Sequence, residues 1–270
     1  MNERLRTPKH LVGKADRVAE CDPAGCDRAY KEDDAANERE PANAEPKEGV
    51  LGWCMNAVRA STHIYNMPGE VDRLIESVRH VAVAFHAAAG NFEAQAEEIA
   101  SELLAGHEVK KIYLRELGAA PARASVIAAF DQGASVMSYL GHGGIHLWAS
   151  EGVFDNDAVS SLNVQPLQPL LLTMNCLNGY FHFPYFDSLA EKLLKSKERG
   201  AVAAFSPTGL SQSAAAQRYH KAILKEILSG AHARLGDAVA AAQAAYLESG
   251  DSAELLGIYH LLGDPALSLR

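Results

Sequence analysis

The chain of 270 residues has no uninterrupted apolar stretch near the roughly 18 residues that cross a bilayer, so we expect no membrane span. Basic residues are fewer than acidic ones: 25 Lys and Arg against 34 Asp and Glu give a net charge of −9. No run of Lys and Arg is present to follow a phosphate backbone. Nucleic acid is therefore not an expected partner.

Cysteine is also scarce. The four cysteines are Cys21, Cys26, Cys54 and Cys176, and their spacing matches neither a dense disulfide framework nor paired zinc ligands. His142 and His146 lie four positions apart, but the intervening glycines oppose a regular helix that would present both to one metal. The sequence therefore predicts no metal site.

Several common enzyme motifs are missing. Neither GxGxxG nor the Walker pattern is present, which argues against a glycine-rich phosphate loop. The triplet His142-Gly143-Gly144 is similar to an oxyanion loop of α/β serine hydrolases, but the chain lacks the Gly-x-Ser-x-Gly elbow of that class. The serine hydrolase interpretation is therefore set aside.

The first 50 residues contain a single aromatic side chain, Tyr30, among many charged residues, Ala and Pro. So little apolar surface cannot offset the entropy of ordering, and we predict a polar, disordered or poorly defined segment over residues 1–70. The first six residues are followed by polar and charged residues rather than by the apolar core of a signal peptide, so the chain as it stands is expected to be cytoplasmic. No feature of the sequence indicates an oligomeric state.

From about residue 71 to residue 270, strand and helix patterns alternate, which predicts one α/β domain built on a parallel sheet. Apolar runs predict strands, and apolar residues at helical spacing predict helices. Residues 263–265, which read GDP, are predicted to form a turn before the last strand. The other expected strands are residues 80–85, 111–114, 135–140, 169–174 and 201–205. Helices are expected over Phe92 to Leu103, residues 123–130, Tyr219 to Ile227 and Leu235 to Tyr246.

Two of these buried runs end in a reactive side chain. The run 135–140 leads into Gly141 and His142, and the run 169–174 leads into Asn175 and Cys176. Ligands bind outside the carboxyl ends of the strands in open α/β sheets, so the imidazole and the thiol are expected at the same sheet edge.

A thiol and an imidazole at one site are typical of nucleophilic catalysis. The thiolate of Cys176 would be the nucleophile, and His142 would raise the reactive fraction and later protonate a leaving amine. Gly143 lacks a Cβ, so the backbone there can approach a scissile carbonyl, and the N–H groups of Gly143 and Cys176 can face an oxyanion.

These motifs resemble the gingipain-type cysteine peptidases of the caspase-like clan. The similarity covers about residues 78 to 270 and rests on several segments in order: YLGHGG at 139–144 followed by Trp148, NCLNGYF at 175–181, SLAE at 188–191, GAVAAFSPT at 200–208 and LGDPAL at 262–267. The resemblance implies a caspase-like (flavodoxin-like) fold, a mostly parallel sheet with helices on both faces. It also implies hydrolysis of a protein or peptide substrate through a Cys176–His142 dyad, with Gly143 in the oxyanion hole and no metal or organic cofactor.

The resemblance also suggests substrate-binding residues. Gingipains cut after Arg or Lys and hold an acid near the start of the first helix, where this chain has Glu93. Asp155 and Asp187 are other acids that could reach the pocket. Cleavage after a basic residue is therefore a hypothesis that depends on which acid lines the cleft.

Four further side chains could contact substrate. Trp148 is interpreted either as a lid over the cleft or as core packing. Ser206 and Thr208, with Ser211, follow a predicted strand on the edge of the dyad, so they form either a substrate-binding loop or an ordinary turn.

One departure from the family pattern leaves an alternative open. Relatives often carry an acid at the end of the first core strand that can orient the histidine, whereas residues 85–89 here read FHAAA. The alternative function is therefore a catalytically inactive or partner-regulated caspase-like module that binds a protein. The lack of a visible signal peptide is a second departure, because known gingipains are secreted. It indicates either a cytoplasmic member of the family or a start site that misses the true beginning, so the localisation is left open.

Overall fold

The computed structural model of the protein describes residues 80–85 and 91–269. Its centre is a six-stranded sheet in the order β2-β1-β3-β6-β7-β8. The first five strands in this order are parallel, and β8 pairs antiparallel with β7. The strands of this sheet are β1 (His80–Phe85), β2 (Glu108–Tyr113), β3 (Val136–Leu140), β6 (Leu170–Met174), β7 (Ala203–Pro207) and β8 (Tyr259–Leu262).

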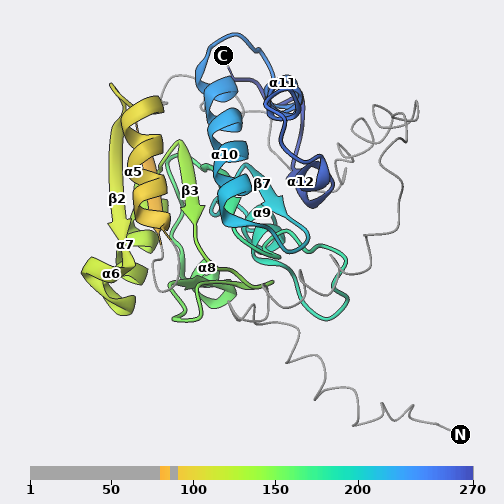
Figure 1. The fold of residues 1–270 in the computed structure, drawn as a ribbon. Coiled ribbons are helices and arrows are strands. Elements are labelled where there is room, and N and C mark those ends of the chain that lie inside the picture. Colours follow the sequence, from red (N-terminus) through yellow and green to blue (C-terminus); the bar gives the residue numbers. More distant parts are fainter. Residues whose placement is uncertain (1–79, 86–90, 270) are drawn as a thin grey trace, which may run out of the picture.

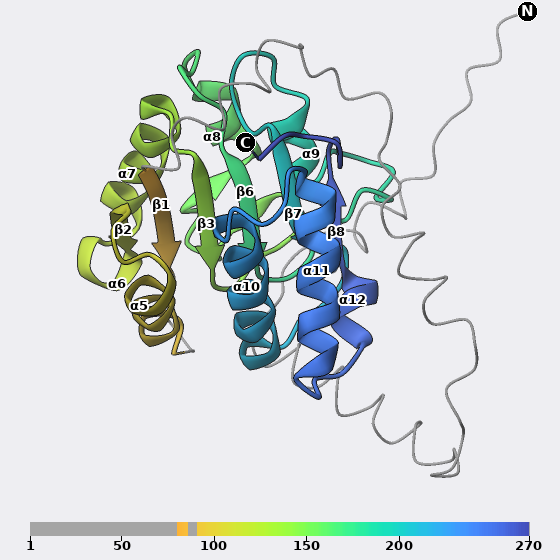
Figure 2. The same ribbon diagram turned by 90° about the horizontal axis from the view of Figure 1, so that it is seen from above.

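Helices cover both faces of the sheet, as predicted (Figure 1). Figure 2 shows α5, α10 and α11 on one side of the strands and α7, α8 and α9 on the other. The helices are α5 (Phe92–Leu103), α6 (Leu114–Leu117), α7 (Ala119–Gln132), α8 (Asn156–Ser161), α9 (Leu189–Leu194), α10 (Ser213–Leu228), α11 (Leu235–Glu248) and α12 (Glu254–Ile258).

Successive side chains along each central strand point to opposite faces of the sheet, so each strand contributes to the hydrophobic core on both faces. On β3, Val136 and Leu140 belong to the core under α5 and α10, whereas Met137 and Tyr139 belong to the core under α7 and α9. All five residues of β3 and of β6 are buried, which explains why these strands are continuous apolar runs rather than alternating ones. A buried polar pair lies between the sheet and α10, where Nε2 of His220 is 2.9 Å from Oγ of Ser138.

The predicted α/β class and the central strands are confirmed, with small shifts at element ends. The strand expected at 111–114 is β2, which begins earlier, and the helix expected at 123–130 is the longer α7. A two-stranded ribbon of β4 (Leu147–Trp148) and β5 (Phe154–Asp155) was not expected, because each strand has only two residues.

The prediction that Gly263-Asp264-Pro265 forms a turn before the last strand is wrong, because β8 precedes it. Gly263 has φ 132°, and a Cβ there would lie 3.0 Å from Cβ of Ala203. Glycine is therefore needed where the chain leaves β8 and passes close to β7.

Among the residues that the structure describes, none of the helices combines the length and the hydrophobicity of a membrane span. The predicted polar segment 1–70 lies outside the described residues.

Candidate active site

His142 and Cys176 follow two neighbouring parallel strands at the same sheet edge. In the register of β3 and β6, Leu140 pairs with Met174, so each candidate residue comes two positions after a paired strand residue. The amide of Gly141 extends this pairing by donating to the carbonyl of Met174 at 3.4 Å. The two turns therefore leave the sheet side by side.

Gly143 packs directly against the turn that carries Cys176. A Cβ on Gly143 would lie 2.1 Å from Nδ2 of Asn175 and 3.0 Å from the carbonyl oxygen of Cys176. No side chain fits at this distance, so glycine is required for the contact between the two turns.

A buried asparagine pair joins these turns, and the sequence analysis missed it. Nδ2 of Asn175 donates to Oδ1 of Asn178 at 2.6 Å. Nδ2 of Asn178 donates in turn to the carbonyls of Gly144 at 2.5 Å and Leu147 at 3.1 Å. Two asparagines flanking a cysteine in an otherwise apolar segment were the available signal, because buried amides require such partners.

The backbone of His142 is fixed by two donors to its carbonyl. The hydroxyl of Tyr139 donates at 2.7 Å and the amide of Ala149 at 3.0 Å. Trp148 is completely buried and stacks on the ring of Tyr139 at 4.5 Å. Trp148 therefore takes the packing role that the sequence left open rather than that of a lid, and it supports the histidine turn through Tyr139.

Burial shifts the ionisation of both candidate residues toward their neutral forms. It lowers the pKa of His142 below its usual 6.5 and raises the pKa of Cys176 above its usual 9.0. At neutral pH the resting site therefore holds a thiol and a neutral imidazole, and this imidazole can accept a proton.

Cys176 is 6% exposed, and its thiol donates to the carbonyl of Ser211 at 3.8 Å. The next residue, Leu177, has φ 64°, a conformation that is uncommon for a bulky side chain and that tends to occur at functional sites. Within the described part of the chain, neither the Gly143 amide nor the Cys176 amide donates a hydrogen bond. Both amides are therefore available to a ligand.

Glu93 follows a residue that contacts the histidine, and it already has a basic partner. It is the second residue of α5, and the first, Phe92, contacts the ring of His142 edge-on at 5.4 Å. One carboxylate oxygen of Glu93 pairs with Arg115 of α6. The other oxygen is buried and has no hydrogen-bond partner among the described residues.

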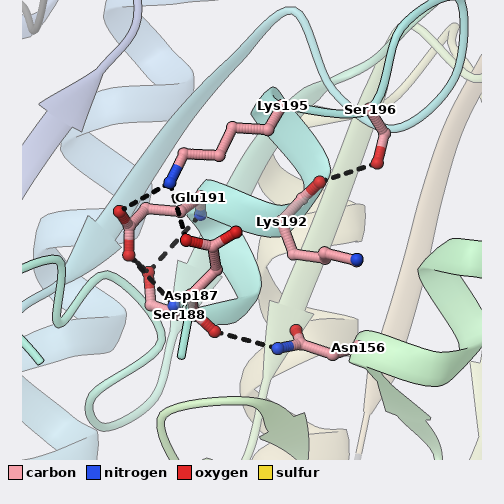
Figure 3. Close-up of polar contacts among 7 residues, drawn as sticks. All are labelled: Asn156, Asp187, Ser188, Glu191, Lys192, Lys195 and Ser196. Atoms are coloured by element: carbon pink, nitrogen blue, oxygen red, sulfur yellow. Dashed lines mark hydrogen bonds and ion pairs between the residues drawn. The ribbon is translucent and has the colours of Figure 1, made fainter. Parts of the chain in front are cut away.

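The other two acids considered for a pocket are held by structural contacts. Asp155 forms two hydrogen bonds of 2.8 Å with Arg123 and caps the start of α8 by accepting from the Ala158 amide. Asp187 pairs with Lys195 at 2.6 Å (Figure 3). These acids stabilise the loops around the site.

The segment after Cys176 is anchored where α9 begins (Figure 3). Asn156 donates through Nδ2 to the carbonyl of Asp187 at 2.8 Å. Ser188 and Glu191 form a capping box, which satisfies amides at the first turn of α9. The SLAE segment thus marks a real helix start.

The hydroxyl groups of Ser206 and Thr208 both make hydrogen bonds within the fold. The hydroxyl of Ser206 is completely buried and lies 2.7 Å from that of Thr173 on β6, so the substrate-binding role predicted for Ser206 is not supported by its position. The amide and the hydroxyl of Thr208 both donate to the carbonyl of Ile258, at 2.8 and 3.0 Å. Thr208 remains partly exposed at the sheet edge.

The segment in which an orienting acid was sought, residues 85–89, lies outside the described residues after Phe85. Across the part of the chain that is described, no three His, Cys, Asp or Glu side chains are grouped as metal ligands.

Comparison with known proteins places this geometry in context. The chain is 28% identical over 193 residues to Gingipain R2 of Porphyromonas gingivalis, an alignment that covers 67% of this chain and 26% of that protein. It has the same identity to Gingipain R1 of Porphyromonas gingivalis, with 67% of this chain and 19% of that protein covered. The chain thus spans about a quarter or less of these relatives.

Solved structures share the fold. The crystal structure of the Arg specific cysteine proteinase gingipain R superposes with a TM-score of 0.62 at 23% identity, over 72% of this chain and 48% of that one. The complex of the RgpB pro- and mature domains of Porphyromonas gingivalis gives a TM-score of 0.61 at 24% identity, over 74% and 49% of the two chains. The predicted caspase-like fold is confirmed.

The family model described as peptidase family C25 matches residues 53–270, and so begins upstream of the domain boundary at 70 that composition predicts. The match includes both candidate catalytic residues and every described element. The chain therefore belongs to peptidase family C25.

Proposed function

We propose that this domain is a cysteine endopeptidase in which Cys176 is the nucleophile and His142 is the general base and acid. The observation that carries the proposal is the placement of both residues after adjacent parallel strands, with the backbone of Gly143 packed on the Asn175–Cys176 turn. Family membership supports the same class of chemistry.

In the first half of the reaction, the Cys176 sulfur attacks the scissile carbonyl while the neutral imidazole of His142 takes the thiol proton. A C–S bond forms, and the carbonyl oxygen becomes an oxyanion. The amides of Gly143 and Cys176, which donate no hydrogen bond within the described part of the chain, are the donors for this oxyanion. The thiol must first leave its hydrogen bond to the Ser211 carbonyl.

The tetrahedral intermediate then collapses. The C–N bond breaks, the imidazolium of His142 gives its proton to the departing amine, and a thioester to Cys176 remains. Water then adds to the thioester as His142 accepts its proton, and the proton returns to sulfur when the C–S bond breaks and the carboxylic acid leaves. The low pKa of His142 suits the base steps of this cycle.

Substrates with Arg or Lys on the acyl side of the cleaved bond are the proposed preference, and Glu93 is the proposed acidic contact. Support comes from its position next to Phe92, which touches His142, and from its one buried carboxylate oxygen that has no hydrogen-bond partner among the described residues. The solved relative gingipain R is described as Arg specific. In the free protein, the other carboxylate oxygen of Glu93 pairs with Arg115, which stands where the substrate cation would bind.

The catalytic assignment is tested by hydrolysis of a fluorogenic peptide library with the full chain. Cys176→Ala and His142→Ala are expected to lose at least about 1,000-fold in kcat/KM, the scale seen when a nucleophile or base is removed. His146→Ala is the matched control, because this second histidine lies in the same turn and contacts Phe186. Equal losses in the three variants, or full activity of Cys176→Ala, would refute the dyad.

The specificity assignment needs a separate comparison. Glu93→Gln should lower kcat/KM for Arg and Lys substrates at least about tenfold while leaving any cleavage after neutral residues unchanged. Glu97→Gln is the control, since Glu97 lies four residues further along α5 and pairs with Lys111 at 2.6 Å. Preference for a non-basic residue in the wild type would remove the role of Glu93 and leave the peptidase proposal intact.

The alternative, an inactive or partner-regulated module, makes a different prediction. Such a protein would cleave no peptide of the library, and a peptidyl electrophile would not label its cysteine. Both results together would replace the peptidase proposal.

A further inference from the structure

Tyr259, the first residue of β8, brings its hydroxyl to the turn that carries the candidate nucleophile. Its side chain is completely buried. The hydroxyl lies 2.8 Å from Oγ of Ser211 and 3.3 Å from the carbonyl oxygen of Asn175, the residue before Cys176. Two segments distant in sequence thus meet at one hydroxyl group.

The antiparallel strand explains this position. Tyr259 pairs with Pro207 at the end of β7, so its side chain starts at the sheet edge where the nucleophile turn lies. The ring stacks on Phe205 at 5.6 Å and meets Tyr219 edge-on at 5.7 Å. Packing on two aromatic rings holds the hydroxyl in one direction.

The direction of the hydrogen bonds is set by chemistry. The Asn175 carbonyl can only accept, so the Tyr259 hydroxyl donates to it, and the Ser211 hydroxyl donates to Tyr259. Burial raises the pKa of Tyr259 well above its usual value, so the phenol keeps the proton that it donates.

The same serine also contacts the nucleophile. The backbone carbonyl of Ser211 accepts from the Cys176 thiol at 3.8 Å, while its side chain is bound to Tyr259. Tyr259 therefore restrains Cys176 in two ways: through the preceding peptide group, and through the loop that accepts the thiol hydrogen bond.

We propose that Tyr259 is a positioning residue for Cys176, whose hydroxyl ties the nucleophile turn to the Ser211 loop and fixes the sulfur for attack. The proposal rests on the peptidase function proposed above. It adds a residue that lies outside all of the sequence motifs from which the family resemblance was drawn.

The first test compares Tyr259→Phe with Tyr246→Phe in the full chain. Each change removes one buried phenol oxygen and keeps the ring, but the Tyr246 hydroxyl has no hydrogen-bond partner in the described part of the protein. Tyr259→Phe should lower kcat by about 10- to 100-fold, the scale of a misplaced catalytic group, with KM within about twofold of wild type. Tyr246→Phe should leave both constants unchanged.

The second test needs no peptidase activity. Iodoacetamide alkylation of Cys176, followed by mass spectrometry, should be at least about threefold faster in Tyr259→Phe, because the buried thiol loses a restraint on the loop whose carbonyl accepts its hydrogen bond. Ser211→Ala should give a smaller increase, since Tyr259 can still donate to Asn175. Tyr246→Phe should match wild type.

These measurements separate the two proposals. If the wild type cleaves no peptide and a peptidyl electrophile does not label Cys176, the peptidase proposal fails, and the iodoacetamide alkylation rates still decide the role of Tyr259. A wild-type alkylation rate in Tyr259→Phe, or equal changes in Tyr246→Phe, would overturn the positioning role.

Discussion

Replacing Gly143 by Ala adds one methyl group at the contact between the histidine and cysteine turns. The new Cβ would lie 2.1 Å from Nδ2 and 2.7 Å from Cγ of Asn175, and 3.0 Å from the carbonyl oxygen of Cys176. The Asn175 amide cannot move without losing its 2.6 Å hydrogen bond to Asn178. The Cys176 carbonyl is backbone, so the turn itself must also shift.

The cost follows from these two displacements. Leaving a buried amide without its partner costs about 1–3 kcal/mol, and forcing a methyl group into a filled space costs about 1–3 kcal/mol. We therefore expect Gly143→Ala to lower the free energy of unfolding by about 2–6 kcal/mol, or Tm by at least about 4 °C. A shift of about 1 Å at the Cys176 turn should also reduce kcat about 100-fold.

Urea and thermal denaturation measure the first effect, and peptide hydrolysis measures the second. Gly257→Ala is the matched control, because Gly257 lies in α12 and no atom is within 4 Å of the position that its new Cβ would take. This control should be stabilised by about 0.5–1 kcal/mol, as for any glycine replaced by alanine inside a helix. Wild-type stability and activity in Gly143→Ala would refute the close contact of the two turns.

Three further outcomes are expected. Burial lowers the pKa of His220 from 6.5 to about 3, so between these two pH values only the unfolded chain binds the proton. In urea titrations the wild type should therefore lose about 2 kcal/mol of unfolding free energy between pH 6.5 and 5 that His220→Gln retains, and equal losses would contradict this. Because burial raises the pKa of Cys176 and lowers that of His142, the alkylation rate of Cys176 should still be rising at pH 9, whereas a plateau below pH 7 would indicate a preformed ion pair. Ser206→Ala removes the hydrogen bond to Thr173, so it should lower the free energy of unfolding by about 1–3 kcal/mol and leave KM unchanged. A higher KM at unchanged stability would instead show that Ser206 binds substrate.

The central sheet could be predicted because its strands carry a strong local signal. Residues 136–140 and 170–174 are buried on both faces, so they read as continuous apolar runs closed by small or polar residues. The ribbon β4–β5 and the antiparallel β8 lack such a signal. Their pairing depends on tertiary contacts, such as the approach of Gly263 to Ala203, that no periodicity encodes.

The sequence could predict that His142 and Cys176 lie at the same edge of the sheet, since parallel strands bring their carboxyl ends together. The partners of those residues could not be predicted. Trp148 and Ser206 have side chains suited to binding substrate, yet the fold buries both completely. Tyr259 is remote in sequence from Cys176, and only the crossing of β8 to the edge of β7 brings its hydroxyl to the nucleophile turn.

The most direct test of the central claim is covalent labelling by a peptidyl acyloxymethyl ketone that carries Arg, followed by intact-mass and peptide mass spectrometry. The account predicts one adduct per wild-type chain, on Cys176, with at least about 100-fold slower labelling of His142→Ala and unchanged labelling of the His146→Ala control. Labelling of His142→Ala at the wild-type rate, or an adduct on any other residue, would contradict the account.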